Sequence, residues 1–232
     1  PPRSTLFPYT TLFRSANAFG WYCRNTGYNS FTAEGKKTAA FEIWEQVIAK
    51  QDLKQPLCVF VSVGDGNIIS GLHKGFKDLH ALGWLDMMPR IFGIQSEGSA
   101  AIANAFDSGI ETIVPVQATT LADSISVDLP RDGLRGLRAA TQTNGAYIQV
   151  SDESILAAIA RLGKEGIFAE PAASTAFAGL QKAVQSGLIT SKDPVVVMNT
   201  GSGLKDVSAA QKAVKAAPII EPSLSAFKKA MG

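Results

Sequence analysis

The chain has 232 residues, of which 46% are hydrophobic and 18% are charged, and its formal charge is +2. This apolar share supports a sizeable buried core, so it excludes a disordered tail, a collagen-like rod and a coiled coil. No apolar run reaches the roughly 18 residues that a membrane span needs, and we expect a soluble protein. Cys23 and Cys58 lie far apart without a histidine-rich context. They predict neither a disulfide scaffold nor a zinc site, and they favour a reducing cytoplasm.

Residues 1–15 do not resemble the start of a protein, because they contain neither a methionine nor a signal-peptide pattern. They match, residue for residue, a translated frame of a common short-read sequencing adapter, so we interpret them as a non-native segment. Arg3 and Arg14 are its only charged residues and account for the whole formal charge. Without them no basic stripe remains that would bind nucleic acid. We expect residues 16–232 to be one continuous unit that lacks an upstream part.

Apolar patterns from Thr32 onward predict that strands alternate with helices. Spacings of three and four residues indicate amphipathic helices, and short continuous apolar runs indicate strands buried on both faces. Helices are expected at 40–48, 68–79, 99–106, 133–143, 152–162 and 177–184, and strands at 57–63, 90–95, 112–116, 146–150 and 195–198. This alternation is typical of an α/β fold with a mostly parallel sheet and helices on both faces.

A few residues predict where these elements begin and end. Asp152 is expected to cap the helix that Gly163 ends. Gly83 and Gly187 are expected just after the ends of two other helices. Pro115 places its strand at an edge or end of the sheet, because proline has no N–H to donate.

The segment at 63–71 is a glycine-rich turn that follows a buried strand and opens a helix. Glycines let successive backbone N–H groups point at an anion, and the helix N-terminus adds about half a positive charge. Two known phosphate loops do not fit, because Ile69 replaces the third glycine of the dinucleotide fingerprint and Leu72 replaces the lysine of the Walker loop. A tight turn without a ligand therefore stays open as an alternative. A similar turn at 199–206 either faces a ligand or only reverses the chain.

Four parts of the sequence together resemble one known family. They are Arg-Asn-Thr-Gly-Tyr-Asn at 24–29 running into Glu-Gly-Lys-Lys-Thr at 34–38, Val-Gly-Asp-Gly-Asn-Ile at 63–68, Gln-Ser-Glu-Gly-Ser at 95–99, and Thr-Gly-Ser-Gly-Leu-Lys-Asp at 200–206. In this order they resemble the threonine synthases, within the tryptophan-synthase-β-like (fold type II) family of pyridoxal-phosphate enzymes. The resemblance implies that the chain after its first segment is the C-terminal part of a catalytic domain that binds pyridoxal 5′-phosphate.

The resemblance implies roles for five residues in holding this cofactor. Gly64, Asp65, Gly66 and Asn67 would offer backbone N–H groups to its phosphate. Thr200 would contact the pyridine nitrogen. Because a hydroxyl, unlike a carboxylate, does not stabilise the pyridinium form, the ring nitrogen would stay largely unprotonated. No metal site is implied.

The resemblance also implies a reaction in which O-phosphohomoserine and water give threonine and phosphate. Such chemistry needs a lysine that forms a Schiff base with the cofactor, and in this family it lies in the N-terminal part, in a Ser-x-Lys context. Residues 16–232 contain no such context, and Lys36, Lys37 and Lys205 are predicted to be surface charges. We therefore expect the chain by itself to be inactive. The resemblance leaves a homodimer open as its assembly.

The remaining polar residues near these motifs are predicted to have structural roles. Glu97 follows a strand and is expected to be an exposed acid. Pro171, after Glu170, is expected in the first turn of a helix. His73 and His80 lie two turns apart on one helix without a carboxylate at ligand spacing, so we predict surface residues rather than a metal pair.

Two other functions remain open. The first is a related pyridoxal-phosphate lyase, such as a threonine or serine dehydratase, although the phosphate loops of those enzymes tend to be Gly-Gly-Gly-Gly-Leu or Gly-Thr-Gly-Gly. The second is a non-catalytic nucleotide- or metabolite-binding α/β domain, which would need an acidic residue about 20 positions after the glycine turn. Asp86 lies near that distance, but it sits in a Trp-Leu-Asp-Met-Met loop.

Overall fold

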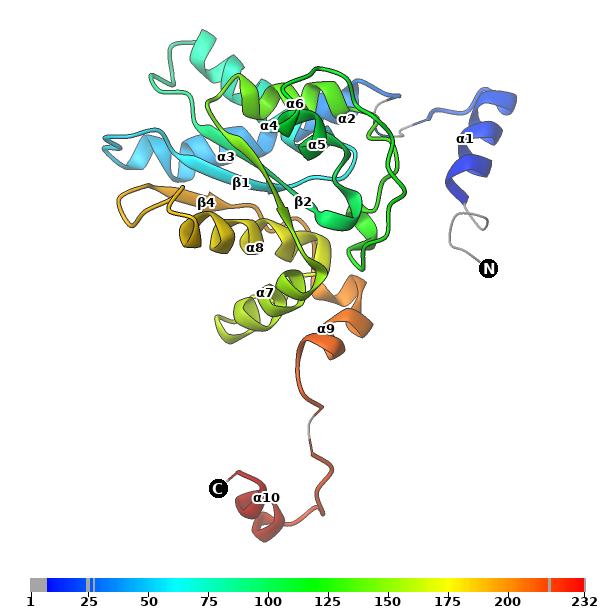
Figure 1. The fold of residues 1–232 in the computed structure, drawn as a ribbon, viewed down its shortest axis with the longest axis vertical. Helices are drawn as coiled ribbons and strands as arrows, with labels where there is room; N and C mark the ends of the chain where they lie inside the picture. The colour runs from blue at the N-terminus through cyan, green and yellow to red at the C-terminus, as the bar shows by residue number, and fades with distance from the viewer. Residues whose placement is uncertain (1–7, 24–25, 27, 217, 232) are drawn as a thin grey trace.

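The computed structural model describes residues 8–23, 26, 28–216 and 218–231. Arg24, Asn25 and Gly27, which carry part of the resemblance, lie outside the described residues. At the centre is a parallel sheet with the strand order β3-β2-β1-β4 (Figure 1). The strands are β1 (Cys58–Ser62), β2 (Arg90–Ser96), β3 (Ala146–Val150) and β4 (Val195–Val197). The predicted parallel sheet is confirmed.

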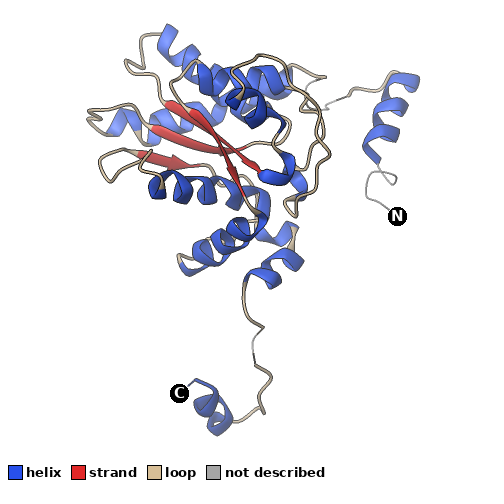
Figure 2. Ribbon diagram, in the orientation of Figure 1, coloured by secondary structure: helices blue, strands red, loops and turns tan. Residues whose placement is uncertain are grey.

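Helices cover both faces of this sheet, as Figure 2 shows. Helices α3 to α6 pack on one face, and α7 and α8 pack on the other. The helices are α1 (Pro8–Phe19), α2 (Phe31–Lys36), α3 (Thr38–Gln46), α4 (Asn67–Ala81), α5 (Ala101–Asp107), α6 (Gly133–Thr141), α7 (Asp152–Lys164), α8 (Pro171–Gln185), α9 (Val207–Ala213) and α10 (Leu224–Met231). The two-sided α/β architecture agrees with the prediction.

Alternate residues of β1 contribute to two separate hydrophobic cores. Val59 and Val61 belong to the core beneath α3 to α6, and Phe60 belongs to the core beneath α7 and α8. The ring of Phe60 stacks on that of Phe92 in β2, with centroids 4.7 Å apart. Burial of each such side chain contributes about 1.5–3 kcal/mol to the free energy of folding. Because successive residues of β1 face opposite cores, apolar residues are needed on both faces, which explains the continuous apolar run in its sequence.

Two predicted boundaries of α7 are corrected. Ser151, rather than Asp152, is its N-cap, and the Ser151 hydroxyl accepts a hydrogen bond from a backbone N–H of the first turn. The carboxylate of Asp152 accepts a bond from the Thr120 hydroxyl instead, at 2.6 Å. The helix also runs through Gly163 and ends before Gly166, whose φ of +79° suits the left-handed position after a helix.

Other predicted boundaries are confirmed. Gly83 and Gly187 follow the ends of α4 and α8 with φ values of +73° and +74°. Pro171 occupies the first turn of α8, where a missing N–H leaves no hydrogen bond unmade.

Residues 112–116 do not form the predicted strand. They belong to the loop between α5 and α6, in which the Val116 N–H donates to the carbonyl of Asp128 at 2.9 Å. Val114 is exposed. Apolar residues form a strand only where a neighbouring strand can pair with them, and here the chain pairs with a later part of its own loop.

His73 is buried, so the prediction that both histidines are surface residues is wrong for this one. His73 is 5% exposed, whereas His80 is exposed. On α4 His73 follows Ile69 by one turn and precedes Phe76 by one turn, and both of these side chains are buried. It therefore lies on the buried stripe of the helix. Burial lowers its pKa to about 4, and the charge of Lys77 adds to the effect.

We expect the free energy of unfolding to fall as the pH decreases from 6.5 to about 4. In that range the unfolded chain, with an ordinary imidazole pKa of 6.5, binds a proton that folded His73 does not bind. The contribution is fully present above pH 6.5 and amounts to at most about 3 kcal/mol. Denaturant titrations of the wild type and His73→Gln measure it. Parallel pH profiles of the two proteins would contradict this assignment.

Tyr147 of β3 has a buried hydroxyl with no hydrogen-bond partner in the described part of the chain. Its ring fills the space beside Gly93, where a Cβ would lie 2.4 Å from the ring. A buried hydroxyl without a partner costs about 1–3 kcal/mol, so Tyr147→Phe is expected to raise the free energy of unfolding by about 1 kcal/mol. Urea unfolding measures this, with exposed Tyr22→Phe as the control. Destabilisation by Tyr147→Phe would show that the hydroxyl has a partner.

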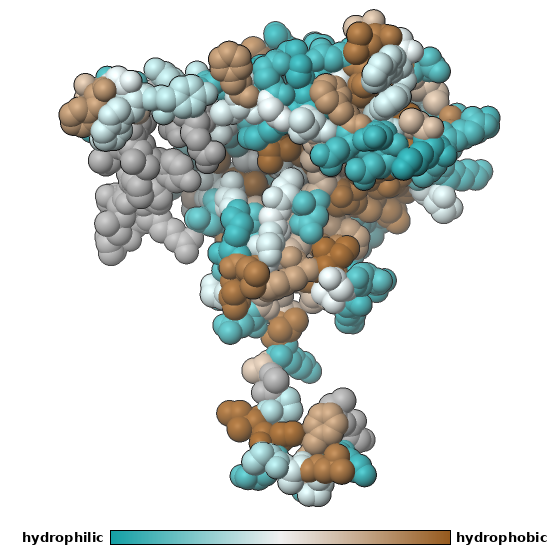
Figure 3. Space-filling model, turned by 180° about the vertical axis from the view of Figure 1, so that it is seen from behind, coloured by the Kyte–Doolittle hydropathy of each residue, from teal (hydrophilic) through white to brown (hydrophobic). Residues whose placement is uncertain are grey.

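Helices α1 and α10 lie apart from the α/β body (Figure 1). Large hydrophobic side chains of the C-terminal segment are exposed, among them Ile219, Leu224 and Phe227. Figure 3 shows brown groups on this segment at the lower end of the molecule. Across the residues that the structure describes, we find no helix with the length and hydropathy needed to cross a bilayer.

Candidate functional site

The turn between β1 and α4 requires glycine at two positions, Gly66 for its backbone conformation and Gly64 for lack of space. Gly66 has a φ of +85°, in the left-handed region that L side chains rarely enter. A Cβ at Gly64 would lie 2.9 Å from the Cα of Ile125. The backbone N–H groups of residues 64–68 have no acceptor within the described part of the chain. Together with the positive end of the α4 dipole, they form a site suited to an anion.

Asp65 fixes this turn to a neighbouring loop. Its carbonyl accepts a hydrogen bond from the Asp132 N–H at 2.8 Å, and its carboxylate accepts one from the Arg131 N–H at 3.1 Å. Burial raises the pKa of the Asp65 carboxyl, and the bond from Arg131 opposes that rise. The side chain of Asp65 is thus used within the protein, while its backbone N–H is left for a ligand.

Asn67 is the first residue of α4, and its side chain is buried, with 3% exposed. Its amide nitrogen donates to Oδ2 of Asp132 at 2.5 Å and to the Thr32 hydroxyl at 3.4 Å. Its amide oxygen accepts a hydrogen bond from the ammonium of Lys36. The Asn67 side chain therefore joins α2 to the loop before α6.

Thr200 is exposed in the turn that follows β4. The segment before α8 holds this turn: the Gly203 N–H donates to the carbonyl of Phe168 at 2.9 Å, and the Glu170 N–H donates to that of Gly201 at 3.1 Å. A Cβ at Gly201 would lie 1.9 Å from Oε1 of Glu170. The carboxylate therefore packs directly on the backbone beside Thr200.

Both turns line one cavity of about 210 Å³. The residues that the sequence assigns to a cofactor all line it: Gly64, Asp65, Gly66, Asn67 and Thr200. They meet because β1 and β4 are parallel neighbours and both turns follow the carboxyl ends of these strands. A second cavity of about 340 Å³ adjoins the first and shares Ser124, Glu170, Ala172 and Lys205 with it.

Two of the three lysines considered in the sequence also line the first cavity. Lys36 is half-buried there, which corrects the prediction that it is a surface charge. Lys205 is 58% exposed, but its Nζ lies 2.9 Å from Oε1 of Glu170 and it lines both cavities. Lys37 is also half-buried, with 19% of its side chain exposed, so the same prediction is wrong for it; it forms ion pairs with Glu34 and Asp78 and is not among the residues that line the cavity.

Glu170 and Ser124 are site residues that the sequence did not reveal. The side chain of Glu170 is 6% exposed, although its position before Pro171 indicated only the start of a helix. The Ser124 hydroxyl lies 3.4 Å from Oε2 of Glu170 and 3.5 Å from Nζ of Lys205. These three residues come from distant segments, so their spacing along the chain carries no signal.

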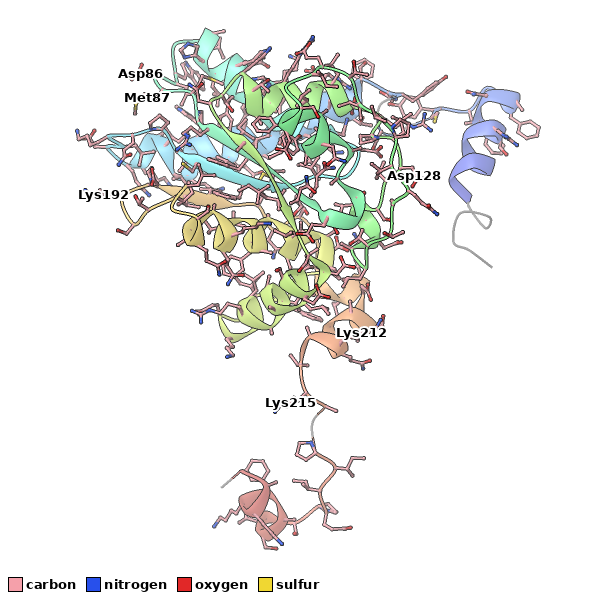
Figure 4. All side chains as sticks on the ribbon, in the orientation of Figure 1. Asp86, Met87, Asp128, Lys192, Lys212 and Lys215 are labelled. Atoms are coloured by element: carbon pink, nitrogen blue, oxygen red, sulfur yellow. The ribbon has the colours of Figure 1, made fainter. Side chains whose placement is uncertain are left out.

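Two acidic residues considered in the sequence lie away from the cavity. Glu97 is exposed, as predicted, and lies 3.8 Å from Lys182. Asp86 precedes β2 and so lies at the amino-terminal edge of the sheet. Figure 4 shows Asp86 at the opposite end of the α/β body from Asp128, which belongs to the loop between α5 and α6. A carboxylate that holds a ribose must lie at the same edge as the glycine turn. This placement argues against a nucleotide-binding domain.

Comparison with known proteins identifies the class of protein. The chain belongs to the family of pyridoxal-phosphate-dependent enzymes, which matches residues 10–201. That match begins inside the segment at 1–15, whose non-native origin stays a prediction.

Several curated relatives of the chain are named threonine synthase. The chain is 36% identical over 203 residues to threonine synthase of Methanocaldococcus jannaschii, covering 87% of this chain and 49% of that protein. It is 35% identical over 207 residues to threonine synthase of Methanosarcina acetivorans, covering 88% and 50%. The chain thus spans about half the length of the curated relatives it matches.

Solved structures confirm the fold. Serine racemase from maize matches with a TM-score of 0.67 at 19% identity, covering 86% of this chain and 58% of that one. Threonine synthase from Escherichia coli matches with a TM-score of 0.56 at 17% identity, covering 84% and 44%. At these identities the likeness shows the fold alone, and it confirms the predicted fold type II architecture.

The residues of the 210 Å³ cavity fit pyridoxal phosphate. Backbone N–H groups without an acceptor at residues 64–68 suit its phosphate dianion. The hydroxyl of Thr200, on the other turn of the cavity, suits a ring nitrogen. Among the described residues, no three histidine, cysteine or acidic side chains are grouped so as to hold a metal ion.

Proposed function

We propose that this chain is part of a threonine synthase, which converts O-phosphohomoserine and water to threonine and phosphate. The family membership supports the cofactor, and the curated relatives, named threonine synthase, support the reaction. The main observation in support of the proposal is that the glycine turn and Thr200 line the same cavity. These two turns could hold the opposite ends of one cofactor.

The proposed roles of the residues follow from their chemistry. The N–H groups of residues 64–68 bind the cofactor phosphate and so fix the position of the ring. Thr200 holds the ring nitrogen through a neutral hydroxyl, which leaves that nitrogen largely unprotonated. Glu170 and Lys205 position the turn that carries Thr200. The cofactor, when bound, supplies an electron sink for negative charge that develops on the substrate.

The Schiff-base lysine is proposed to lie outside these 232 residues. Lys36 contacts Asn67, Lys37 pairs with Glu34, and Lys205 pairs with Glu170. None of them stands in the Ser-x-Lys context that the resemblance implies. The chain alone is therefore proposed to bind cofactor without catalysing the reaction.

The proposed setting is the cytoplasm, because Cys23 and Cys58 are both free thiols. A homodimer is the assembly that we propose to test. Sedimentation of the complete enzyme at several concentrations measures it directly.

Phosphate release tests the proposed function. The complete reading frame that contains this chain is expected to release phosphate from O-phosphohomoserine and to form threonine in equal amount. The 232-residue chain alone is expected to release none. A complete enzyme that converts threonine or serine to a 2-oxo acid, and releases no phosphate from O-phosphohomoserine, would instead be a dehydratase.

A further inference from the structure

Lys36 brings a positive charge to the cavity that holds the glycine turn. Its side chain lines this cavity, and its ammonium donates a hydrogen bond to the amide oxygen of Asn67, the first residue of α4. The amide nitrogen of Asn67 donates to Asp132 and Thr32, so the amide oxygen is turned toward Lys36. The cation is therefore held beside the helix end whose N–H groups suit an anion.

The packing of α2 on α4 sets the position of Lys36. A Cβ at Gly71 would lie 2.7 Å from both the Ala33 carbonyl and the Cβ of Lys36. A Cβ at Gly75, one turn later, would lie 2.8 Å from the Lys37 carbonyl. Two glycines on one face of α4 thus let α2 approach closely. This approach fixes the backbone of Lys36 beside the first turns of α4.

The charges around the glycine turn make a cation there useful. The carboxylates of Asp65 and Asp132 both lie next to the turn, and a phosphate would add further negative charge. Arg135 pairs with Asp132. Burial raises the pKa of the Asp65 carboxyl; the N–H and charge of Arg131 oppose this rise, and the charge of Lys36 adds a smaller effect in the same direction. Lys36 therefore reduces the repulsion that these carboxylates would exert on a bound anion.

Lys205, the other lysine of the cavity, is already paired. Its Nζ lies 2.9 Å from the buried carboxylate of Glu170, on the side of the second turn. A phosphate that bound the Lys205 ammonium would have to compete with the Glu170 carboxylate for it. Lys36 instead donates a hydrogen bond to the neutral amide of Asn67, on the side of the glycine turn.

We propose that Lys36 binds a phosphate monoester dianion in this cavity by an ion pair added to the backbone N–H groups of residues 64–68. The proposal rests on the proposed function, which supplies two such dianions, that of the cofactor and that of the substrate. Lys36 is then a binding residue on α2 that acts through its positive charge, whereas the glycine turn binds through its backbone N–H groups.

Binding of pyridoxamine 5′-phosphate to the 232-residue chain tests the proposal. This ligand and pyridoxamine cannot form Schiff bases with lysines, and their fluorescence reports binding. Lys36→Gln is expected to weaken binding of pyridoxamine 5′-phosphate about tenfold, to leave pyridoxamine binding unchanged and to reduce the salt dependence of phosphate-ligand binding. Lys36→Arg, which keeps the charge, is expected to retain most of the affinity. Lys74→Gln is the matched control, because Lys74 is a half-exposed lysine of α4 that pairs with Glu34 outside the cavity.

A second arm separates the two sources of phosphate. O-phosphohomoserine is added to the chain loaded with pyridoxamine 5′-phosphate, and the change in ligand fluorescence is followed. If Lys36→Gln weakens only this response, Lys36 binds the substrate phosphate. If it weakens neither binding step, while thermal unfolding shows a folded variant, the proposal for Lys36 is wrong. A wild-type chain that binds pyridoxamine 5′-phosphate no more tightly than pyridoxamine overturns the proposed function and this proposal with it.

Discussion

Replacement of Gly66 by alanine is expected to weaken binding of pyridoxamine 5′-phosphate about 100-fold, the equivalent of losing two charge-assisted hydrogen bonds. At a φ of +85° an added Cβ would lie 2.8 Å from the carbonyl oxygen of Asp132. The turn must therefore move, and its N–H groups lose their common direction. We also expect the free energy of unfolding to fall by about 2–4 kcal/mol, since left-handed strain and the displaced carbonyl add together.

Gly83→Ala provides the matched control for Gly66→Ala. Gly83 also has a positive φ, +73°, but an added Cβ there meets no atom within 4 Å. We expect it to destabilise the protein by about 1 kcal/mol through strain alone and to leave ligand affinity within twofold. If Gly66→Ala weakened binding no more than Gly83→Ala, the glycine turn would not be the phosphate site.

Replacement of Asn67 by alanine is expected to lower the free energy of unfolding by about 2–3 kcal/mol, because it leaves buried groups without their hydrogen bonds. The Asp132 side chain, which is 2% exposed, loses the Asn67 donor and keeps that of Arg135. Lys36 loses the Asn67 amide oxygen as one acceptor at the cavity. Urea unfolding measures the effect on stability, and titration with pyridoxamine 5′-phosphate measures the effect on binding.

A double-mutant cycle with Asp132→Ala isolates the Asn67–Asp132 bond. Once the carboxylate is gone, Asn67→Ala should cost at least 1 kcal/mol less than in the wild type, since about 1–3 kcal/mol belongs to the buried carboxylate oxygen that has lost its donor. Asn104→Ala is the surface control, because Asn104 is exposed and its amide bonds, among the described residues outside its own helix, to Gln149 alone. It should change stability by less than about 0.5 kcal/mol. Strict additivity in the cycle would show that the two side chains do not act together.

The sequence predicted those features that depend on local pattern. The continuous apolar run around Phe60 predicted a strand buried on both faces, and Gly83 predicted the end of α4. Because parallel strands end at one edge, a glycine turn after one strand and Thr200 after another could be expected near each other. The cavity that they share follows from the adjacency of β1 and β4.

Features that depend on long-range contacts could not be predicted in this way. Glu170 is a buried site residue that pairs with Lys205 and packs on Gly201, and nothing in the sequence joins these positions. Residues 112–116 have the composition of a strand but no strand beside them. His73 is a different case, because its spacing from Ile69 and Phe76 already marks the buried stripe of α4.

The claim that the cavity binds pyridoxal phosphate through residues 64–68 is tested most directly by one pair of titrations. The 232-residue chain is titrated with pyridoxamine 5′-phosphate and with pyridoxamine, which differ only in the phosphate. We predict that the phosphate-bearing ligand binds at least about 100-fold more tightly, since its dianion gains several charge-assisted hydrogen bonds. Equal affinity for the two ligands would contradict the assignment of the glycine turn as the phosphate site.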